Sequence, residues 1–71
     1  MNIIRPEGRV WFLASCVELY KDVKGMSRHE AYGYLRETGA VRFIVDCWEA
    51  LHTTSPAFIV DSIDEYVRNN A

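Results

Sequence analysis

Glu49 and His52 are the residues whose types and spacing best suit chemistry in this chain. They stand three positions apart, so on a helix they share one face, and Thr53 follows directly. A carboxylate can orient an imidazole and hold its proton, which makes this a candidate acid–base pair. A structural explanation competes, because a histidine in the last helical turn binds free carbonyl groups and favours the negative helix end. We favour the structural explanation, since no serine or cysteine with a base partner lies nearby in the sequence.

Other kinds of reactive site lack their spacing signals. His29 and His52 are far apart and Cys16 and Cys47 are single, so no zinc or calcium pattern is present. The four glycines are scattered and form no phosphate-binding loop. Both cysteines sit in apolar segments, which favours free buried thiols over a disulfide. The sequence therefore predicts no metal and no cofactor.

Size and charge limit the class of protein further. The 71 residues suit a single helical domain over 1–71, and the formal net charge of −2 argues against a stand-alone nucleic-acid binder. The densest apolar stretch, Val10 to Tyr20, is too short to span a bilayer. Residues 1–6 lack the charged start and apolar core of a signal peptide. We expect a cytoplasmic protein that makes no membrane contact.

Proline, glycine and capping residues divide the chain into four helical pieces. The first runs from about Glu7 to Lys24 and the second from Arg28 to Thr38, where Ser27 and Glu30 form a capping box. The third is predicted as one helix from Ala40 to His52, because its apolar residues keep helical spacing as far as Leu51. The residues from Val41 to Val45 would also suit a strand, but the spacing continues beyond the length of a typical strand. The fourth opens at Ser55-Pro56.

These pieces predict an all-α fold, a compact bundle of four short helices. The first and third helices have the widest apolar faces, so we expect them in the centre with the second and fourth covering them. So short a chain has too few residues to cover both faces fully, and the remainder is then a partner or dimer surface. The candidate contact residues are Trp11, Phe12, Tyr34 and Phe43, with a polar rim of Glu49, His52 and Thr53.

The chain resembles a small bacterial family of uncharacterised domains of about this length. The resemblance rests on Cys16-Val17-Glu18-Leu19-Tyr20, Gly39, Trp48-Glu49-Ala50-Leu51-His52-Thr53 and Ile59-Val60-Asp61-Ser62-Ile63-Asp64. Trp48 stands where tyrosine is more usual in that pattern. The resemblance implies no catalytic residues. It does imply a gene arrangement similar to toxin–antitoxin pairs, beside predicted ADP-ribosyltransferase-like proteins, and hence an accessory or neutralising role.

Three functional hypotheses follow. The first is a non-enzymatic protein-interaction domain, working through a protein partner such as a neighbouring toxin-like enzyme, or through self-association. The second is a small enzyme or ligand-binding domain that uses Glu49 and His52. The third is an oligomeric regulator that contacts DNA, because a helix, Thr38-Gly39 and a second helix superficially fit a helix-turn-helix. The helix after Gly39 offers few basic groups to a DNA groove, which argues against the third.

Overall fold

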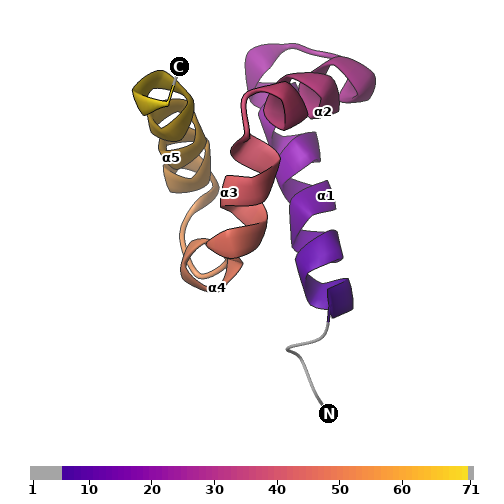
Figure 1. The fold of residues 1–71 in the computed structure, drawn as a ribbon. Coiled ribbons are helices and arrows are strands. Elements are labelled where there is room, and N and C mark those ends of the chain that lie inside the picture. Colours follow the sequence, from indigo (N-terminus) through magenta and orange to yellow (C-terminus); the bar gives the residue numbers. More distant parts are fainter. Residues whose placement is uncertain (1–5, 71) are drawn as a thin grey trace.

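Capping residues and glycines set the helix ends in the computed structural model, which describes residues 6–70 (Figure 1). The helices are α1 (Pro6–Lys24), α2 (Arg28–Glu37), α3 (Ala40–Asp46), α4 (Trp48–Leu51) and α5 (Pro56–Asn69). Residues 1–5 and Ala71 lie outside the described residues. These include most of the residues on which the signal-peptide prediction was based and both ends of the predicted domain, 1–71.

Both predicted caps are present. The Ser27 hydroxyl accepts from the amide of Glu30 at 3.1 Å, and the Ser27 amide donates to the Glu30 carboxylate at 3.0 Å, which completes the capping box. Ser55 accepts from the amide of Phe58 at 3.2 Å, with Pro56 at the first helical position. These local contacts fix where α2 and α5 begin.

The prediction of one helix from Ala40 to His52 was wrong at Cys47. There φ is −106° and ψ is 17°, so α3 ends at Asp46 and the short α4 follows. The Cys47 carbonyl still accepts from the amide of Leu51 at 2.9 Å, which starts the new turn. Trp48 and Leu51 remain buried beyond the break. Both side chains therefore stay buried although the helix is interrupted before them.

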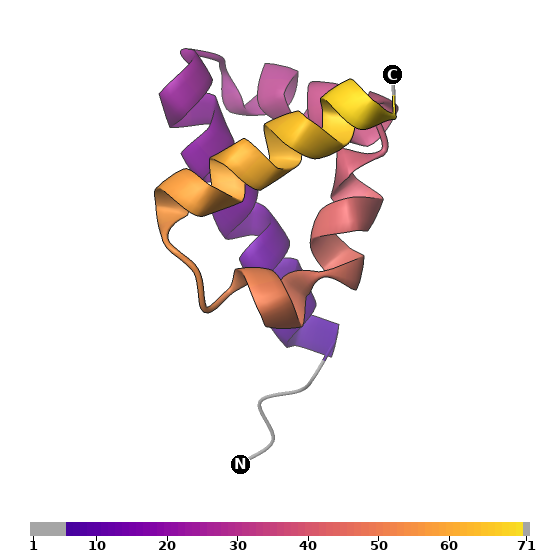
Figure 2. The same cartoon turned by 90° about the vertical axis from the view of Figure 1, so that its left-hand side faces the viewer.

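The core lies where α1 and α3 meet their neighbours. Each of these two helices contacts both α2 and α5, which confirms their predicted central place. Figure 2 shows α5 crossing in front of α1, which it contacts. The fully or nearly fully buried core side chains come from all four longer helices: Cys16, Val17, Tyr20, Ala31, Leu35, Ala40, Ile44, Ile59, Val60 and Ile63.

The all-α fold class is confirmed. Four helices of seven residues or more and one single-turn helix account for the regular structure in residues 6–70, and no strand occurs there. No helix in that range combines the length and the apolar character needed to cross a membrane.

A polar cluster ties α5 to α1 across the core edge. The Tyr20 hydroxyl donates to one carboxylate oxygen of Asp64 at 2.7 Å, and the Lys24 ammonium donates to the other at 2.8 Å. Partial burial raises the pKa of Asp64, but the hydrogen bonds from Lys24 and Tyr20 outweigh burial, so its pKa lies below the usual value. The carboxylate is therefore ionised and acts as a tether between the two helices.

Candidate interaction surface

The four aromatic residues singled out from the sequence do not gather on one surface. Trp11 is 74% exposed on the outer side of α1, whereas Phe12 is half-buried against the core. Phe43 is half-buried and stacks on Tyr66, with ring centres 4.6 Å apart. Tyr34 is partly exposed and stacks on the buried Tyr20 at 6.0 Å. Trp11 alone among the four offers most of its ring to a partner.

Glu49, His52 and Thr53 lie together at the end of α4, in contacts typical of a helix terminus. The ring nitrogen Nδ1 of His52 lies 2.9 Å from the Trp48 carbonyl, and the imidazole tilts against the Trp48 ring at 4.9 Å. The Thr53 hydroxyl donates to the Ala50 carbonyl at 3.2 Å. Glu49 is exposed. These contacts satisfy helix-end carbonyl groups, as the structural explanation expects.

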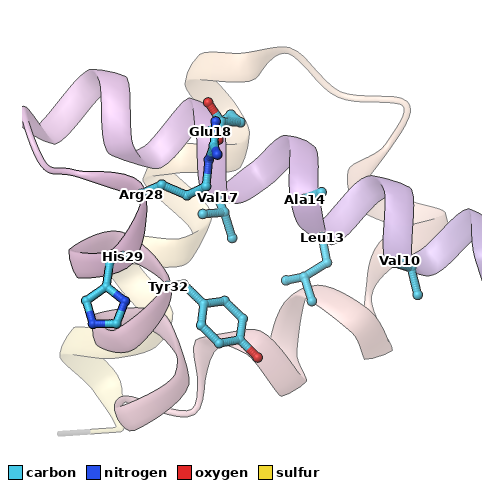
Figure 3. A pocket seen from close by; sticks show the side chains of 8 residues that line it. All are labelled: Val10, Leu13, Ala14, Val17, Glu18, Arg28, His29 and Tyr32. Atoms are coloured by element: carbon cyan, nitrogen blue, oxygen red, sulfur yellow. The ribbon is translucent and has the colours of Figure 1, made fainter.

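A groove lies between α1 and α2. It has a volume of about 800 Å³ and is partly open to solvent, and Figure 3 shows the side chains that line it. Its walls and floor are mostly apolar, and its lining residues are Val10, Leu13, Ala14, Val17, Glu18, Arg28, His29 and Tyr32. An open apolar groove of this shape suits a side chain or a helix of another protein.

The polar groups of the groove gather at one end. There Arg28 of α2 forms a hydrogen-bonded ion pair with Glu18 of α1, and Lys21 lies 3.5 Å from the same carboxylate (Figure 3). The hydrogen bond from Arg28 is the main reason that the pKa of Glu18 lies below its usual value. Glu18 is thus an ionised partner of two cations, an arrangement that joins the helices and leaves the rest of the groove apolar.

The α1 residues at the open end of the groove are unusually exposed for apolar side chains. Val10 is 65% exposed and lies on the groove, while Trp11 follows it in sequence on the outer side of the same helix. We call the surface made by Val10, Leu13, Ala14, Val17 and Tyr32 the α1–α2 face, and the exposed Trp11 is next to Val10 in the sequence. It is apolar over two helical turns of α1.

A second hollow, of about 330 Å³, lies where α1 meets the start of α5. It is lined by Leu19, Val23, Pro56, Ala57, Val60 and Asp61. Val23 and, nearby on α5, Phe58 are each more than half exposed. This hollow is less than half the volume of the groove, so it is the weaker candidate.

Two kinds of candidate reactive group, thiols and metal ligands, can be placed in the described residues. Burial raises the pKa of the Cys16 thiol to about 11, which keeps it protonated and unreactive at neutral pH. No three His, Cys, Asp or Glu side chains in residues 6–70 come close enough together to hold a metal ion. The chemistry available on the α1–α2 face is apolar contact with a salt-bridged rim.

The sequence did not identify Tyr32 or Arg28 as part of any surface. The sequence did indicate the α1 side of the groove, because spacings of four and three residues place Val10, Ala14 and Val17 along one side of this helix. The contribution of α2 depends on how it packs beside α1, and no local pattern contains that information.

Comparison with protein families gives one match. Residues 11–70 match the family described as Protein of unknown function (DUF3791). Searches of the curated proteins and of the solved structures each found no match.

Proposed function

The chain belongs to this family of unknown function, DUF3791, and from that premise we propose that it is a non-enzymatic domain that binds another protein. The binding surface is the α1–α2 face. The observation that carries the proposal is the exposure of Trp11 and Val10 beside an apolar groove of about 800 Å³. A contiguous apolar surface is costly to keep in water, and in soluble proteins such surfaces mark sites of interaction.

The composition of this face suits a protein partner. Tryptophan is enriched among the residues that dominate the binding energy of protein interfaces. Such residues are surrounded by contacts that exclude water. Here the apolar residues are central and the charges of Glu18 and Arg28 stand at the edge. An apolar centre with a polar rim is the usual anatomy of a protein–protein interface.

The acid–base alternative has less support. His52 contacts the backbone and ring of Trp48 within its own helical turn, and Glu49 extends into solvent. A general base must instead point toward a site that can hold a substrate. The groove, which could hold one, is lined by neither residue.

A matched pair of substitutions on α1 tests the proposal. Val10 and Val23 are exposed to similar extents, 65% and 57%, but only Val10 lies on the α1–α2 face. A tagged full-length chain is used to co-purify partners from its native host, and each captured protein is then produced and purified. Its affinity for wild type, Val10→Asp and Val23→Asp is measured by calorimetry.

We expect Val10→Asp to weaken binding by at least about 30-fold, because a carboxylate must be desolvated at the centre of an apolar contact. Val23→Asp should bind like wild type. Circular dichroism confirms that both variants are folded. A partner that is insensitive to Val10→Asp, or the absence of both a partner and self-association, would contradict the proposal.

The resemblance to a family with toxin–antitoxin-like gene arrangements adds one partner class to this experiment. A toxin-like enzyme encoded beside the chain is the first purified protein to test. The proposed setting is the cytoplasm of a bacterium, in which free thiols such as those of Cys16 and Cys47 remain reduced.

A further inference from the structure

We propose that the first half of α1 is a conformational switch: it unfolds locally while the rest of the fold stays intact, and the groove between α1 and α2 exists only while it is helical. We call this segment, residues 6–15, the α1 arm. The inference adds a regulation to the proposed binding surface, so its functional meaning rests on the proposed function, whereas the opening of the arm does not. It is carried by a sharp change in burial and in tertiary contacts along one helix.

Burial along α1 changes abruptly at Cys16. None of residues 8–15 is buried, and the side chains of Val10 and Trp11 are 65% and 74% exposed. From Cys16 onward, α1 supplies three side chains to the core, each 5% exposed or less. Helices in proteins owe most of their stability to the packing of their apolar face rather than to intrinsic propensity. Packing therefore stabilises the second half of α1 far more than the α1 arm.

The contacts of α1 with the other helices are divided in the same way. Within the described residues, its side-chain hydrogen bonds to other helices come from three residues of its second half: Glu18, Tyr20 and Lys24. The α1 arm is attached more weakly. Phe12 and Leu13 are half-buried against the core, and the exposed Arg9 guanidinium lies 5.9 Å from the centre of the Trp48 ring. These contacts can break without disturbing the buried residues of α1.

The α1 arm is also a poor helix by itself. It is shorter than the roughly 12–15 residues below which an isolated helix is marginal in water. It contains Gly8, the β-branched Val10 and the aromatic pair Trp11-Phe12, all of which favour a helix less than alanine does. Segments with few buried contacts open at a lower free energy than the core does. We therefore expect the arm to open as a unit that ends where core packing begins, at Cys16.

Opening of the α1 arm removes one wall of the groove. Val10, Leu13 and Ala14 line the groove and belong to the arm, whereas Val17 and, on α2, Tyr32 remain in place (Figure 3). A partner that binds only the formed groove shifts the equilibrium toward the helical arm, because a ligand stabilises the state to which it binds. The groove is therefore made and unmade without unfolding of the core.

Native-state hydrogen exchange of the full chain, followed for single amides by NMR, tests the proposal without any partner. After correction for intrinsic rates, the amides of residues 10–15 should exchange at least about 10-fold faster than those of residues 20–22. The second group is the reference because its helical acceptors, residues 16–18, lie beyond the arm. Urea below the unfolding transition should speed exchange of residues 20–22 only, because local opening exposes little surface.

A matched pair of variants separates local from global opening. Ala14→Gly weakens the helical arm, because glycine favours a helix less than alanine does, and should speed exchange of both groups of amides about 5-fold. Gly33→Ala is the reverse change in α2, at a position where a Cβ would meet nothing within 4 Å. It should slow exchange of residues 20–22 by about 2–5-fold and leave residues 10–15 unchanged, because α2 stays folded when the arm opens.

Equal exchange rates in the two groups, or the same dependence on urea, would overturn the inference, because α1 would then open as one unit. Fast exchange confined to residues 10 and 11 would also overturn it, since that is only the fraying of a terminal turn. So would slower exchange of residues 10–15 in Gly33→Ala. The two proposals fail separately. A rigid arm still permits Val10-dependent binding of a partner, whereas an arm that opens in a chain without any partner would end the proposed function alone.

Discussion

At the scale of single residues, Asp64 contributes most clearly to the joining of distant parts of the chain. Its carboxylate receives hydrogen bonds from Tyr20 and Lys24, which lie 44 and 40 positions away. Burial and the nearby carboxylate also raise the pKa of the Tyr20 hydroxyl, so this group remains a donor at neutral pH. The contact therefore depends on the charge of Asp64.

This dependence predicts how stability changes with pH. Because the pKa of Asp64 is lower in the folded state, its contribution is present above the unfolded value near 4 and is lost as pH falls through the folded value. Asp64→Asn should cost about 1 kcal/mol of unfolding free energy at pH 7 and flatten the decline below about pH 5. Urea unfolding at several pH values measures both effects.

Asp61→Asn is the control for this prediction, since Asp61 is exposed on the same helix. It should change stability by less than about 0.5 kcal/mol and leave the pH profile unaltered. Equal pH profiles for wild type and Asp64→Asn would show that the tether contributes nothing.

His52 allows a separate test at the same scale. Its contacts to the carbonyl and ring of Trp48 serve the end of α4. We therefore expect His52→Gln to lower the unfolding free energy by about 0.5–1 kcal/mol and to leave partner affinity unchanged. Glu49→Gln, at an exposed neighbour, should be neutral. If both variants kept wild-type stability but lost an activity of the protein, the acid–base hypothesis would replace the structural explanation.

At the scale of elements, two glycines on either side of the end of α2 have opposite roles. Gly39 joins α2 to α3 with φ of +85°, in the left-handed region, and a Cβ there would lie 3.5 Å from the Tyr66 hydroxyl. Gly33 lies inside α2, and a Cβ there would meet nothing within 4 Å. The first position needs glycine for its backbone conformation, whereas the second does not.

The same substitution at the two glycines should therefore change stability in opposite directions. Gly39→Ala should cost about 1 kcal/mol or more, because alanine rarely adopts this φ. Gly33→Ala should add about 0.5–1 kcal/mol, because alanine favours a helix and restricts the unfolded chain. Thermal and urea unfolding of both variants check the signs. A loss of stability in Gly33→Ala would mean that this position lacks the free space seen here.

At the scale of the whole molecule, a small core leaves little stability in reserve. A domain of about 70 residues buries only about 60% of the surface that its unfolded chain exposes. Ile44 is completely buried in α3, the helix that contacts α1, α2 and α5. Removing a methyl group from Ile44 therefore removes buried contacts at the point where these helices meet.

We expect Ile44→Val to cost about 0.5–1.5 kcal/mol and Ile44→Ala about 2–5 kcal/mol, through lost burial and the cavity left behind. The larger loss approaches the total stability of a domain this size, so Ile44→Ala should be largely unfolded at 37 °C. Val23→Ala, at a site 57% exposed on α1, is the control and should stay within about 0.5 kcal/mol of wild type. Circular dichroism during urea titration measures all three.

Local sequence determined where α2 and α5 begin and the all-α class. The capping box at Ser27 and the cap at Ser55 depend on contacts within four residues, so they can be predicted without knowledge of the fold. The apolar spacing of α1 and α3 likewise indicated that both helices would be central, as their contacts show.

Only the tertiary structure decided which apolar residues remain exposed. Phe12 and Phe43 were predicted to contact a partner, as Trp11 was, yet they pack against the core while Trp11 does not. The groove beside Tyr32 also depends on α1 and α2 packing together. Local patterns report which face of a helix is apolar, but how much of that face is covered depends on the positions of neighbouring helices.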